Sequence, residues 1–380
     1  LLAVARSHLA AALSPQGRWQ EALAEYEAMQ AGLAGDPEHQ RKYLKFNVGW
    51  AIALMTAGRP DAALEILNPA REYRRRLVGD NHQSTAHVRG LIAMAHAAKG
   101  DRARALRDFS DATQVLLMPA TDVEDEAANR ATQDRRLALV LEAYMRLLAD
   151  IRGTAMEQQA GIDAAAEAFR MAEVARGRSV QRALDASAAR AAAKTPALAD
   201  LVRREQDVKK QISALNGLLA NVLTAPTDQQ DPKVMENLRG RIESVRRARE
   251  TLSEQIKKEF PAYAELLNPI PATLDRARAT LRPGEALITT YVSRDRTYVW
   301  AIPASGTVAF AVAPLGQKTL EEIVPKLRAS LDPSAKTLGD IPEFDLALAH
   351  RIYATLLDPV KSGWQQADSL LVVAHGPLGQ

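Results

Sequence analysis

The heptapeptide Gly58-Arg59-Pro60-Asp61-Ala62-Ala63-Leu64 decides the fold, because the chain contains two close copies of it. The copies are Gly17–Leu23 and Gly100–Leu106, which places the three leading glycines 41 and 42 residues apart. Each heptapeptide has an alanine at its sixth position and a large apolar residue four positions later: Ala22 and Tyr26, Ala63 and Leu67, and Ala105 and Phe109. A regular period of this length is typical of stacked helical repeats.

The residue types in this pattern have a physical reason. Glycine ends a helix at low cost because it adopts a positive φ without strain. An alanine lets two paired helices approach closely, and a large residue four positions later lies on the same helix face. The pattern therefore predicts pairs of helices stacked in register. An ordinary helical bundle is the alternative, but it does not explain the recurring register.

This pattern resembles the tetratricopeptide repeat in its long form of about 42 residues. The run Gly79–Thr85 is similar to the extended link between repeats of that form. We predict a superhelical repeat array over residues 1–175, with a degenerate fourth unit around Ala165, Phe169 and Ala172 that an insertion near Pro119–Gln133 displaces. The resemblance implies a protein or peptide partner that binds in the groove of the repeats.

Residues 176–260 predict a long antiparallel helical hairpin. Apolar residues recur at alternating steps of four and three over Val208–Val222 and again over Leu238–Ile256, with Arg249 interrupting the second series. Such spacing gives each helix a narrow apolar seam. The polar run Thr224–Pro232 separates the two series, and we expect the hairpin to fold against the last repeat. Its charges alternate in sign, which favours a solvated face over a nucleic-acid patch.

The composition excludes several classes of protein. With 47% hydrophobic and 25% charged residues, the chain is neither wholly disordered nor collagen-like. The formal net charge of +3 gives no case for a nucleic-acid partner. No apolar run approaches the roughly 20 residues that span a bilayer, so we predict no membrane span. The length of 380 residues indicates two or three domains.

Proline divides the chain into a helical part and a mixed part, because it is tolerated poorly inside helices. Eight of the 19 prolines precede residue 261 and the other eleven lie in the last 120 residues, beginning with Pro261, so we place a linker at residues 261–284. Three short runs after the linker predict an antiparallel β-meander: Ala286–Val292, Thr297–Ile302 and Thr307–Ala313. Helices are expected at about 318–331, with Pro325 inside, and at about 343–357. The final apolar run, Ser369–Ala374, predicts a strand buried on both faces of a parallel sheet.

The order of these elements resembles the opening of a CHAT domain, a caspase-like module that is associated with tetratricopeptide repeats. The resemblance is carried by Ile352–Pro359 and by Leu371–Gln380, although Ala374-His375 replaces the family's usual Pro-Asp before Gly376. The run Ala172–Ser179 is similar to a helix that usually precedes the hairpin in this family. The fold class that we predict is mainly α, namely a repeat array (1–175), a helical hairpin (176–260), a linker (261–284) and an incomplete α/β caspase-like module (285–380).

The resemblance implies a His–Cys dyad in which a thiolate attacks a carbonyl carbon and the imidazole transfers the proton. The 380 residues contain no cysteine, so we predict no catalytic, cofactor-binding or metal-binding residue among them. We expect the chain to be truncated at both ends and the dyad to lie beyond Gln380. The alternative is a repeat adaptor without enzymatic activity, whose last module is structural. We expect a cytoplasmic location, and an export signal upstream stays open.

The histidines are interpreted as structural residues. His375-Gly376 has the dipeptide expected of a catalytic histidine in this clan, but it follows the wrong strand, so we predict a turn residue. His96 lies in an alanine-rich helix and is expected to pack in a core. His82 and His87 lack the spacing of a helical metal pair, and His8, His39 and His350 are isolated. The acidic run Asp122–Glu126 predicts a solvated loop.

Overall fold

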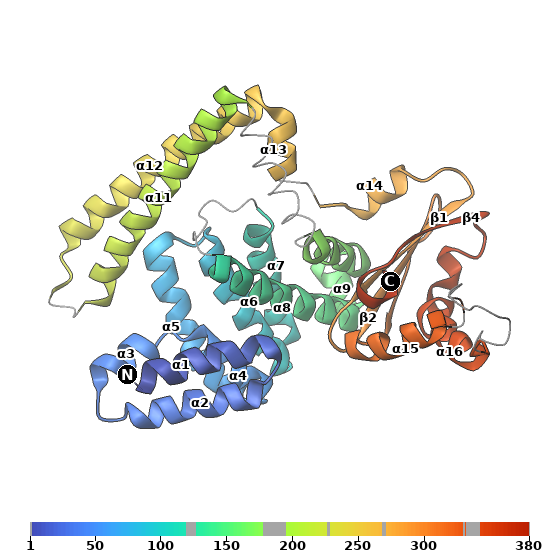
Figure 1. Ribbon diagram of the computed structural model, residues 1–380, viewed down its shortest axis with the longest axis horizontal. Coiled ribbons are helices and arrows are strands. Elements are labelled where there is room, and N and C mark those ends of the chain that lie inside the picture. Colours follow the sequence, from blue (N-terminus) through green and yellow to red (C-terminus); the bar gives the residue numbers. More distant parts are fainter. Residues whose placement is uncertain are drawn as a thin grey trace. The chain divides into compact units, whose positions relative to one another are not determined.

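A computed structural model describes residues 2–118, 127–177, 195–225, 229–267, 271–329, 331 and 343–379. The chain forms two compact units, shown in Figure 1. The first consists of Leu1–Tyr144 with Arg178–Ile270, and the second of Met145–Gly177 with Pro271–Gln380. This division is by contacts within each unit. The domain boundaries predicted above, at residues 175, 260 and 284, remain a prediction about the pieces from which the chain is built.

The first unit begins with paired helices. The pairs are α1 (Leu2–Leu13) with α2 (Trp19–Gly32), α4 (Val48–Thr56) with α5 (Pro60–Val78), and α6 (Gln83–Ala98) with α7 (Arg102–Leu116). The short helices η1 (Ser14–Gln16) and α3 (Pro37–Tyr43) lie between them, and α8 (Ala127–Ile151) follows. The predicted helical repeats are confirmed.

The recurring residues occupy equivalent places in the three pairs. Each alanine is the fourth residue of the second helix and is fully buried, at Ala22, Ala63 and Ala105. The glycines before these helices, Gly17, Gly58 and Gly100, have φ values of 75°, 74° and 82°. Because such values strain any residue with a side chain, glycine is required at these turns. The 42-residue period therefore records a repeated backbone geometry.

The predicted hairpin consists of α11 (Pro196–Thr224) and α12 (Pro232–Glu259). One end of its apolar seam, built around Leu215, Leu219 and Ile242, also packs against Tyr73 and Leu77 of α5. The hairpin therefore folds against the second helical pair, and the expectation that it folds against the last repeat was wrong. The reason is the length of α5, whose 19 residues carry these two apolar side chains on its C-terminal half.

Arg249 interrupts the apolar seam because it forms an ion pair within the hairpin. Its Nε atom lies 3.2 Å from Oε1 of Glu205, and Nζ of Lys209 lies 3.0 Å from the same oxygen. The side chains of Arg249 and Glu205 are only 12% and 14% exposed. A buried polar pair of this kind fixes the register of two helices more than it stabilises them. Helix α13 (Pro261–Leu267) follows α12.

The second unit contains a four-stranded sheet in the order β3-β2-β1-β4. The strands are β1 (Glu285–Val292), β2 (Thr297–Pro303), β3 (Ala309–Ala313) and β4 (Ser369–Val373). The first three form the predicted antiparallel meander, whereas β4 pairs parallel to β1 with Glu285 opposite Ser369 and Thr289 opposite Val373. The other elements are α14 (Leu274–Ala279), α15 (Gln317–Ala329, with Pro325 inside), α16 (Leu346–Leu356), η4 (Asp358–Gly363) and η5 (Gly376–Gly379).

Helices cover the two faces of this sheet in different ways. On one face Ile288, Val299 and Ala301 form a core with Leu356 of α16 and Val360 of η4. Gly363 is required there, since a Cβ atom would lie 2.5 Å from the Ala301 carbonyl oxygen. The opposite face carries an aromatic row, Tyr298, Trp300 and Phe310, whose rings stack on one another. The helix at residues 164–177 packs on this row through Phe169.

Strand β4 differs from its prediction. It is a parallel strand as expected, but all five of its residues are exposed. Its side chains alternate between the two faces, and among the described strands only β1 pairs with it, along one edge. The expectation of burial on both faces was therefore wrong for this chain, because a continuous apolar run reports what a strand can bury and not what covers it.

Candidate functional site

The helices that begin the second and third pairs are buried along almost their whole length. On α4 and on α6 only the last residue is exposed, at Thr56 and at Ala98. The buried side chains include Trp50, Leu54, Leu91 and Ile92. Few side chains on these two helices are accessible to a partner, so the groove site stays a prediction.

Two histidines lie at the start of α6. The Nδ1 atom of His82 accepts the backbone N–H of Ser84 at 3.1 Å and thereby caps the helix. The Nδ1 atom of His87 lies 2.9 Å from the carbonyl oxygen of Gln83, one turn earlier. Both contacts belong to the first turns of a helix, and they give these residues a structural role.

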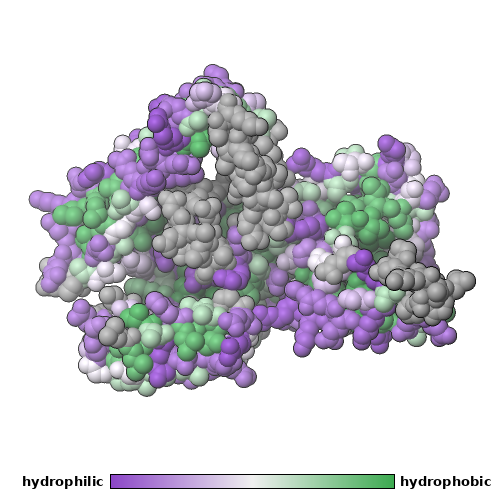
Figure 2. Space-filling view, in the orientation of Figure 1, coloured by the Kyte–Doolittle hydropathy of each residue, from purple (hydrophilic) through white to green (hydrophobic). Residues whose placement is uncertain are grey.

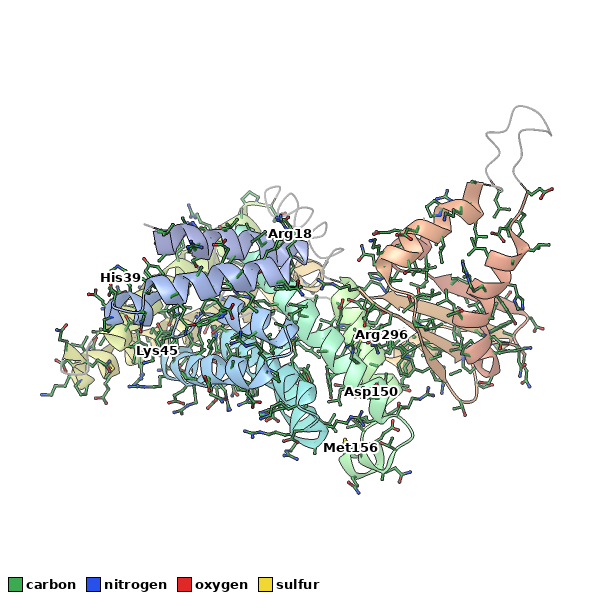
Figure 3. The ribbon with its side chains drawn as sticks, turned by 90° about the horizontal axis from the view of Figure 1, so that it is seen from below. Arg18, His39, Lys45, Asp150, Met156 and Arg296 are labelled. Atoms are coloured by element: carbon green, nitrogen blue, oxygen red, sulfur yellow. The ribbon has the colours of Figure 1, made fainter. Side chains whose placement is uncertain are left out.

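The isolated histidines also make local contacts. His39 lies exposed on α3 (Figure 3). Its Nδ1 atom is 2.6 Å from the carboxylate of Asp36. The ring of His350 is tilted against that of Tyr353, with 6.4 Å between centroids, and His8 is exposed on α1. Among the residues that the structure describes, no group of three or more acidic, histidine or cysteine side chains is arranged to hold a metal ion. The acidic run Asp122–Glu126 lies outside the described residues.

His96 is packed in the core between α6 and α7, as predicted. It is only 5% exposed. Burial lowers the pKa of His96, and the positive charge of Arg104 lowers it further. Its Nε2 atom is 3.8 Å from a carboxylate oxygen of Asp108, too far for a hydrogen bond. The side chain is therefore a buried packing residue of this core.

His375 follows β4 and is held against β1 by three contacts. The backbone N–H of Val292 donates to Nδ1 at 3.0 Å, and the His375 backbone N–H donates to Oγ1 of Thr290 at 3.1 Å. The imidazole ring stacks on Tyr291 with 4.7 Å between centroids and 10° between planes. Burial, followed by the charge of Arg176, lowers the pKa of His375. His375 lies two residues beyond the end of β4, and its side chain continues the pairing of β1 and β4.

Arg176 connects the helix at residues 164–177 with strand β1. Its guanidinium donates to the carbonyl oxygen of Thr290 at 2.7 Å and to Oγ1 of Thr289 at 3.0 Å. Its other terminal nitrogen is 2.5 Å from the carboxylate of Glu173. Burial raises the pKa of Glu173, and Arg176 opposes that effect. The pair is thus a desolvated ion pair that positions the helix on the sheet.

Trp300 provides the second attachment of this helix. The side chain is fully buried, and its Nε1–H donates to the carbonyl oxygen of Ala165 at 3.0 Å. Phe169 meets the indole ring edge to face with 5.8 Å between centroids. Arg152, directly after α8, makes a separate contact with strand β3. Its guanidinium donates to the Phe310 carbonyl oxygen and lies 5.2 Å above the Phe310 ring.

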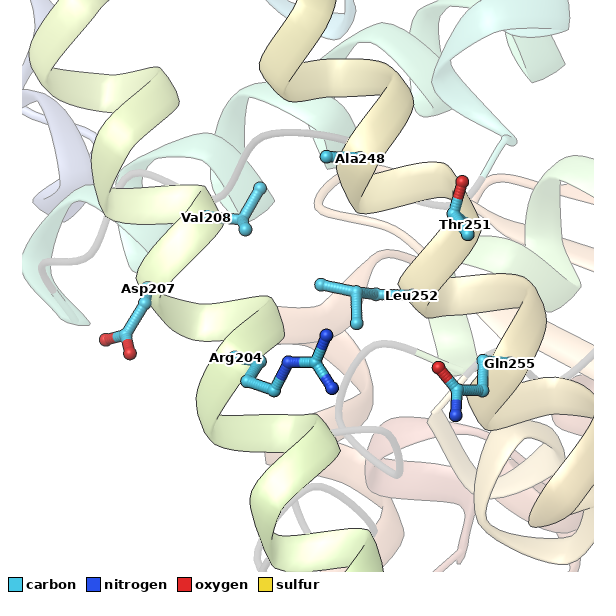
Figure 4. Close-up of a pocket in the computed structure, with 7 residues that line it drawn as sticks. All are labelled: Arg204, Asp207, Val208, Ala248, Thr251, Leu252 and Gln255. Carbon is cyan, nitrogen blue, oxygen red and sulfur yellow. The ribbon is translucent and has the colours of Figure 1, made fainter.

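A cavity of about 520 Å³ lies between the two helices of the hairpin (Figure 4). Val208 and Leu252 face each other across it, and Arg204 reaches into it from α11. Asp207 points away from the space, and Ala248, Thr251 and Gln255 complete the lining. This lining has no nucleophile or acid–base pair, so its chemistry fits a binding groove and not a catalytic centre.

Among the residues that the structure describes, the longest run of large exposed apolar side chains is in strand β4. Leu370, Leu371, Val372 and Val373 are each between 42% and 64% exposed. Figure 2 shows a hydrophobic patch in the region where Figure 1 draws β1 and β4. Large contiguous apolar patches on a protein surface are typical of interaction sites for another protein segment, a membrane or a ligand.

Sequence reasoning missed the residues that attach the helix at 164–177 to the sheet. The motif Ala172–Ser179 directed attention to this helix, and Arg176 belongs to that motif. Nothing in the motif names Thr289 and Thr290 as its acceptors, since they are more than 110 positions away. For Trp300, the sequence offers one signal. A tryptophan in an apolar strand has an indole N–H that needs an acceptor, and the strand itself supplies no polar side chain beside it.

Comparison with known proteins supports the repeat assignment. Residues 44–117 match the family model described as tetratricopeptide repeat. Searches among curated proteins and among solved structures found no match. The described helices include none that is both long and apolar enough to cross a membrane. The match supports tetratricopeptide repeats at residues 44–117, and such repeats support a role as a protein-interaction scaffold.

Proposed function

We propose that these 380 residues are the interaction and sensing portion of a cysteine peptidase of the CHAT family. In this proposal the His–Cys dyad lies beyond Gln380, because none of the 380 residues is a cysteine. The repeats bind a protein or peptide partner, and the α/β module belongs to the caspase-like domain. The observation that carries the proposal is the state of strand β4.

Parallel strands in α/β proteins usually have both faces covered by helices. β4 is parallel to β1, is composed of large apolar residues and has every residue exposed. An unpaired edge of this kind readily accepts a further strand. The proposal accounts for this edge, because the rest of a caspase-like sheet would pair with β4 and cover its faces.

Helix α8 supports a sensing role. It is one helix from Ala127 to Ile151, and the division between the two units falls inside it, after Tyr144. Phe109 of α7 stacks on Tyr144, whereas Arg146 forms an ion pair with Asp295 in the turn after β1. Partner binding at the repeats would act on the module through this helix if α8 has a different contact in each of two states.

The proposal is tested on the natural longer chain. We expect this chain to cleave members of a peptide library. Cleavage should stop after alkylation of thiols, and it should also stop when alanine replaces the cysteine that follows the next strands. A partner of the repeats is expected to change the rate of cleavage. Cleavage that survives both treatments would contradict the proposal, as would a longer chain without a His-Gly and a Cys after successive strands.

The absence of cysteine favours a second candidate, an adaptor in which the α/β module is purely structural. In that case the longer chain binds its partner through the repeats and cleaves nothing. The two candidates differ in one readout, since only the peptidase reacts stoichiometrically with an electrophilic probe of activated thiols. A longer chain that binds a partner and ignores the probe is the adaptor.

A further inference from the structure

We propose that His375 is a pH-sensitive latch that holds the end of β4, and the segment η5 behind it, against strand β1. The backbone ladder between β1 and β4 ends at the pair Thr289 and Val373. Beyond it, the Val292 N–H has no carbonyl of β4 to bond, and the His375 ring takes that place with Nδ1. The latch is therefore one residue that replaces a ladder bond with a titratable acceptor.

The latch works only with a neutral imidazole. Nδ1 accepts a hydrogen bond, so the proton of the neutral ring is on Nε2. Protonation adds the second proton of the ring, at Nδ1. The Nδ1–H then faces the N–H of Val292, and Nδ1 can no longer accept a hydrogen bond from it. The bond between Thr290 Oγ1 and the His375 backbone remains, but the side-chain part of the latch is lost.

Burial of the ring, followed by the charge of Arg176, opposes protonation of His375. On the helix at residues 164–177, the positive charge of Arg176 acts on the His375 ring. The carboxylate of Glu173 on the same helix is hydrogen-bonded to Arg176. From β1, the ring of Tyr291 covers one face of the imidazole. The charged side chains of the neighbouring helix α15 are all exposed: Lys318, Glu321, Glu322, Lys326 and Arg328. No acidic side chain among the described residues is hydrogen-bonded or ion-paired to His375.

Opening the latch releases apolar contacts. Leu378 of η5 packs into both core clusters on the helical face of the sheet, beside Leu315 and Ile352. Val292 and Leu320 lie in the second of these clusters. Because η5 directly follows His375, loss of the His375–Val292 bond loosens the segment that closes this end of the core. A fall in pH would thus free the carboxyl end of the apolar strand β4.

The sign of the effect follows from linkage. The pKa of the latched histidine is lowered from the ordinary value of 6.5, so the latched state binds a proton less readily than a state in which the ring is exposed to water. The latch is complete above this value and weakens as the pH falls below it, until the pH reaches the lowered pKa of the latched state. Within that window the opening constant increases by up to roughly tenfold for each unit of pH.

The test is amide hydrogen exchange of Val292 between pH 7.5 and 5, expressed as a protection factor so that the intrinsic pH dependence of exchange cancels. We expect protection of Val292 to fall below pH 6.5, while Ala311 in the β2–β3 ladder keeps its protection. His375→Asn is the matched control, because its Oδ1 sits near the position of Nδ1 and does not titrate. This variant should retain protection across the range.

His375→Leu replaces the ring with an apolar side chain that has no hydrogen-bond acceptor. The amide of Val292 should therefore show low protection in this variant at every pH. If either variant fails to fold, the wild-type profile and the other variant still decide. His96 lies in the other unit and also has a lowered pKa. Protection of the α6 amides shows separately whether protonation of His96 contributes to a pH effect. The proposal is overturned if wild-type protection of Val292 is flat down to pH 5, or if His375→Asn shows the same pH dependence as the wild type.

Discussion

The repeat array is stabilised by contacts between residues that are close in the sequence, whereas the sheet module is stabilised by contacts between residues that are far apart in the sequence. In the array each helical pair is formed by neighbouring segments, and the same glycine and alanine recur in every pair. In the second unit, Trp300 bonds to Ala165 across 135 positions and Arg176 bonds to Thr290 across 114. Local contacts leave a period in the sequence, whereas distant contacts leave single residues whose partners no pattern identifies.

The comparison shows that the helix at residues 164–177 belongs with the sheet. Its buried residues, including Ala165, Phe169 and Ala172, gave it the appearance of a fourth repeat. The structure places this helix on the aromatic row of β2 and β3. An apolar helix face has the same sequence pattern whether it packs on a helix or on a sheet, because the period reports only the face.

The largest effect is expected from removing the indole of Trp300. Trp300→Ala removes a fully buried ring that stacks on Phe310 at 4.9 Å and bonds to Ala165, and we expect the free energy of unfolding of the second unit to fall by about 3–5 kcal/mol. Urea denaturation followed by near-UV circular dichroism measures it.

Trp300→Phe is the matched control for this substitution. It keeps an aromatic ring and loses the N–H donor, and the Ala165 carbonyl keeps its place in the hydrogen-bond ladder of the helix. The expected cost is therefore about 0.5–1.5 kcal/mol for the lost hydrogen bond. If both variants cost less than 1 kcal/mol, the helix at residues 164–177 does not depend on the sheet.

An intermediate effect is expected from Arg176. Arg176→Met removes the two bonds to β1 and leaves the Glu173 carboxylate buried without its partner, which should cost about 2–3 kcal/mol. Arg170→Met in the same helix removes an ion pair to Glu167 whose arginine is 36% exposed, so its cost should stay below about 1 kcal/mol. Equal costs in thermal unfolding would show that Arg176 is an ordinary surface arginine.

The smallest effect is expected in the array, where the change is local. Ala105→Leu inserts three carbons at a fully buried contact of α7, and we expect a loss of about 1–2 kcal/mol from overpacking. Ala103→Leu lies two positions earlier on the exposed face and should change stability by less than about 0.5 kcal/mol. Chemical denaturation of the two variants compares them directly, and a neutral Ala105→Leu would contradict the role given to the recurring alanine.

The fold could be predicted further than the site. The glycine–alanine period, the narrow seam of the hairpin and the proline distribution predicted the array, the hairpin and the mixed region, since each reflects local physics of the backbone or of one helix face. The exposed state of β4 and the attachment of Arg176 to β1 could not be predicted. Both depend on which segments are present to cover a surface, and neither has a local signature.

The central claim is that residues 164–177 and the sheet unfold as one unit, separately from the paired helices. Native-state hydrogen exchange of Trp300→Ala tests it most directly. The account predicts that amides of residues 164–177 lose protection together with those of β1 and β2, while α6 and α7 keep theirs. Protection of residues 164–177 that stays unchanged and equal to that of α6 and α7 would contradict it.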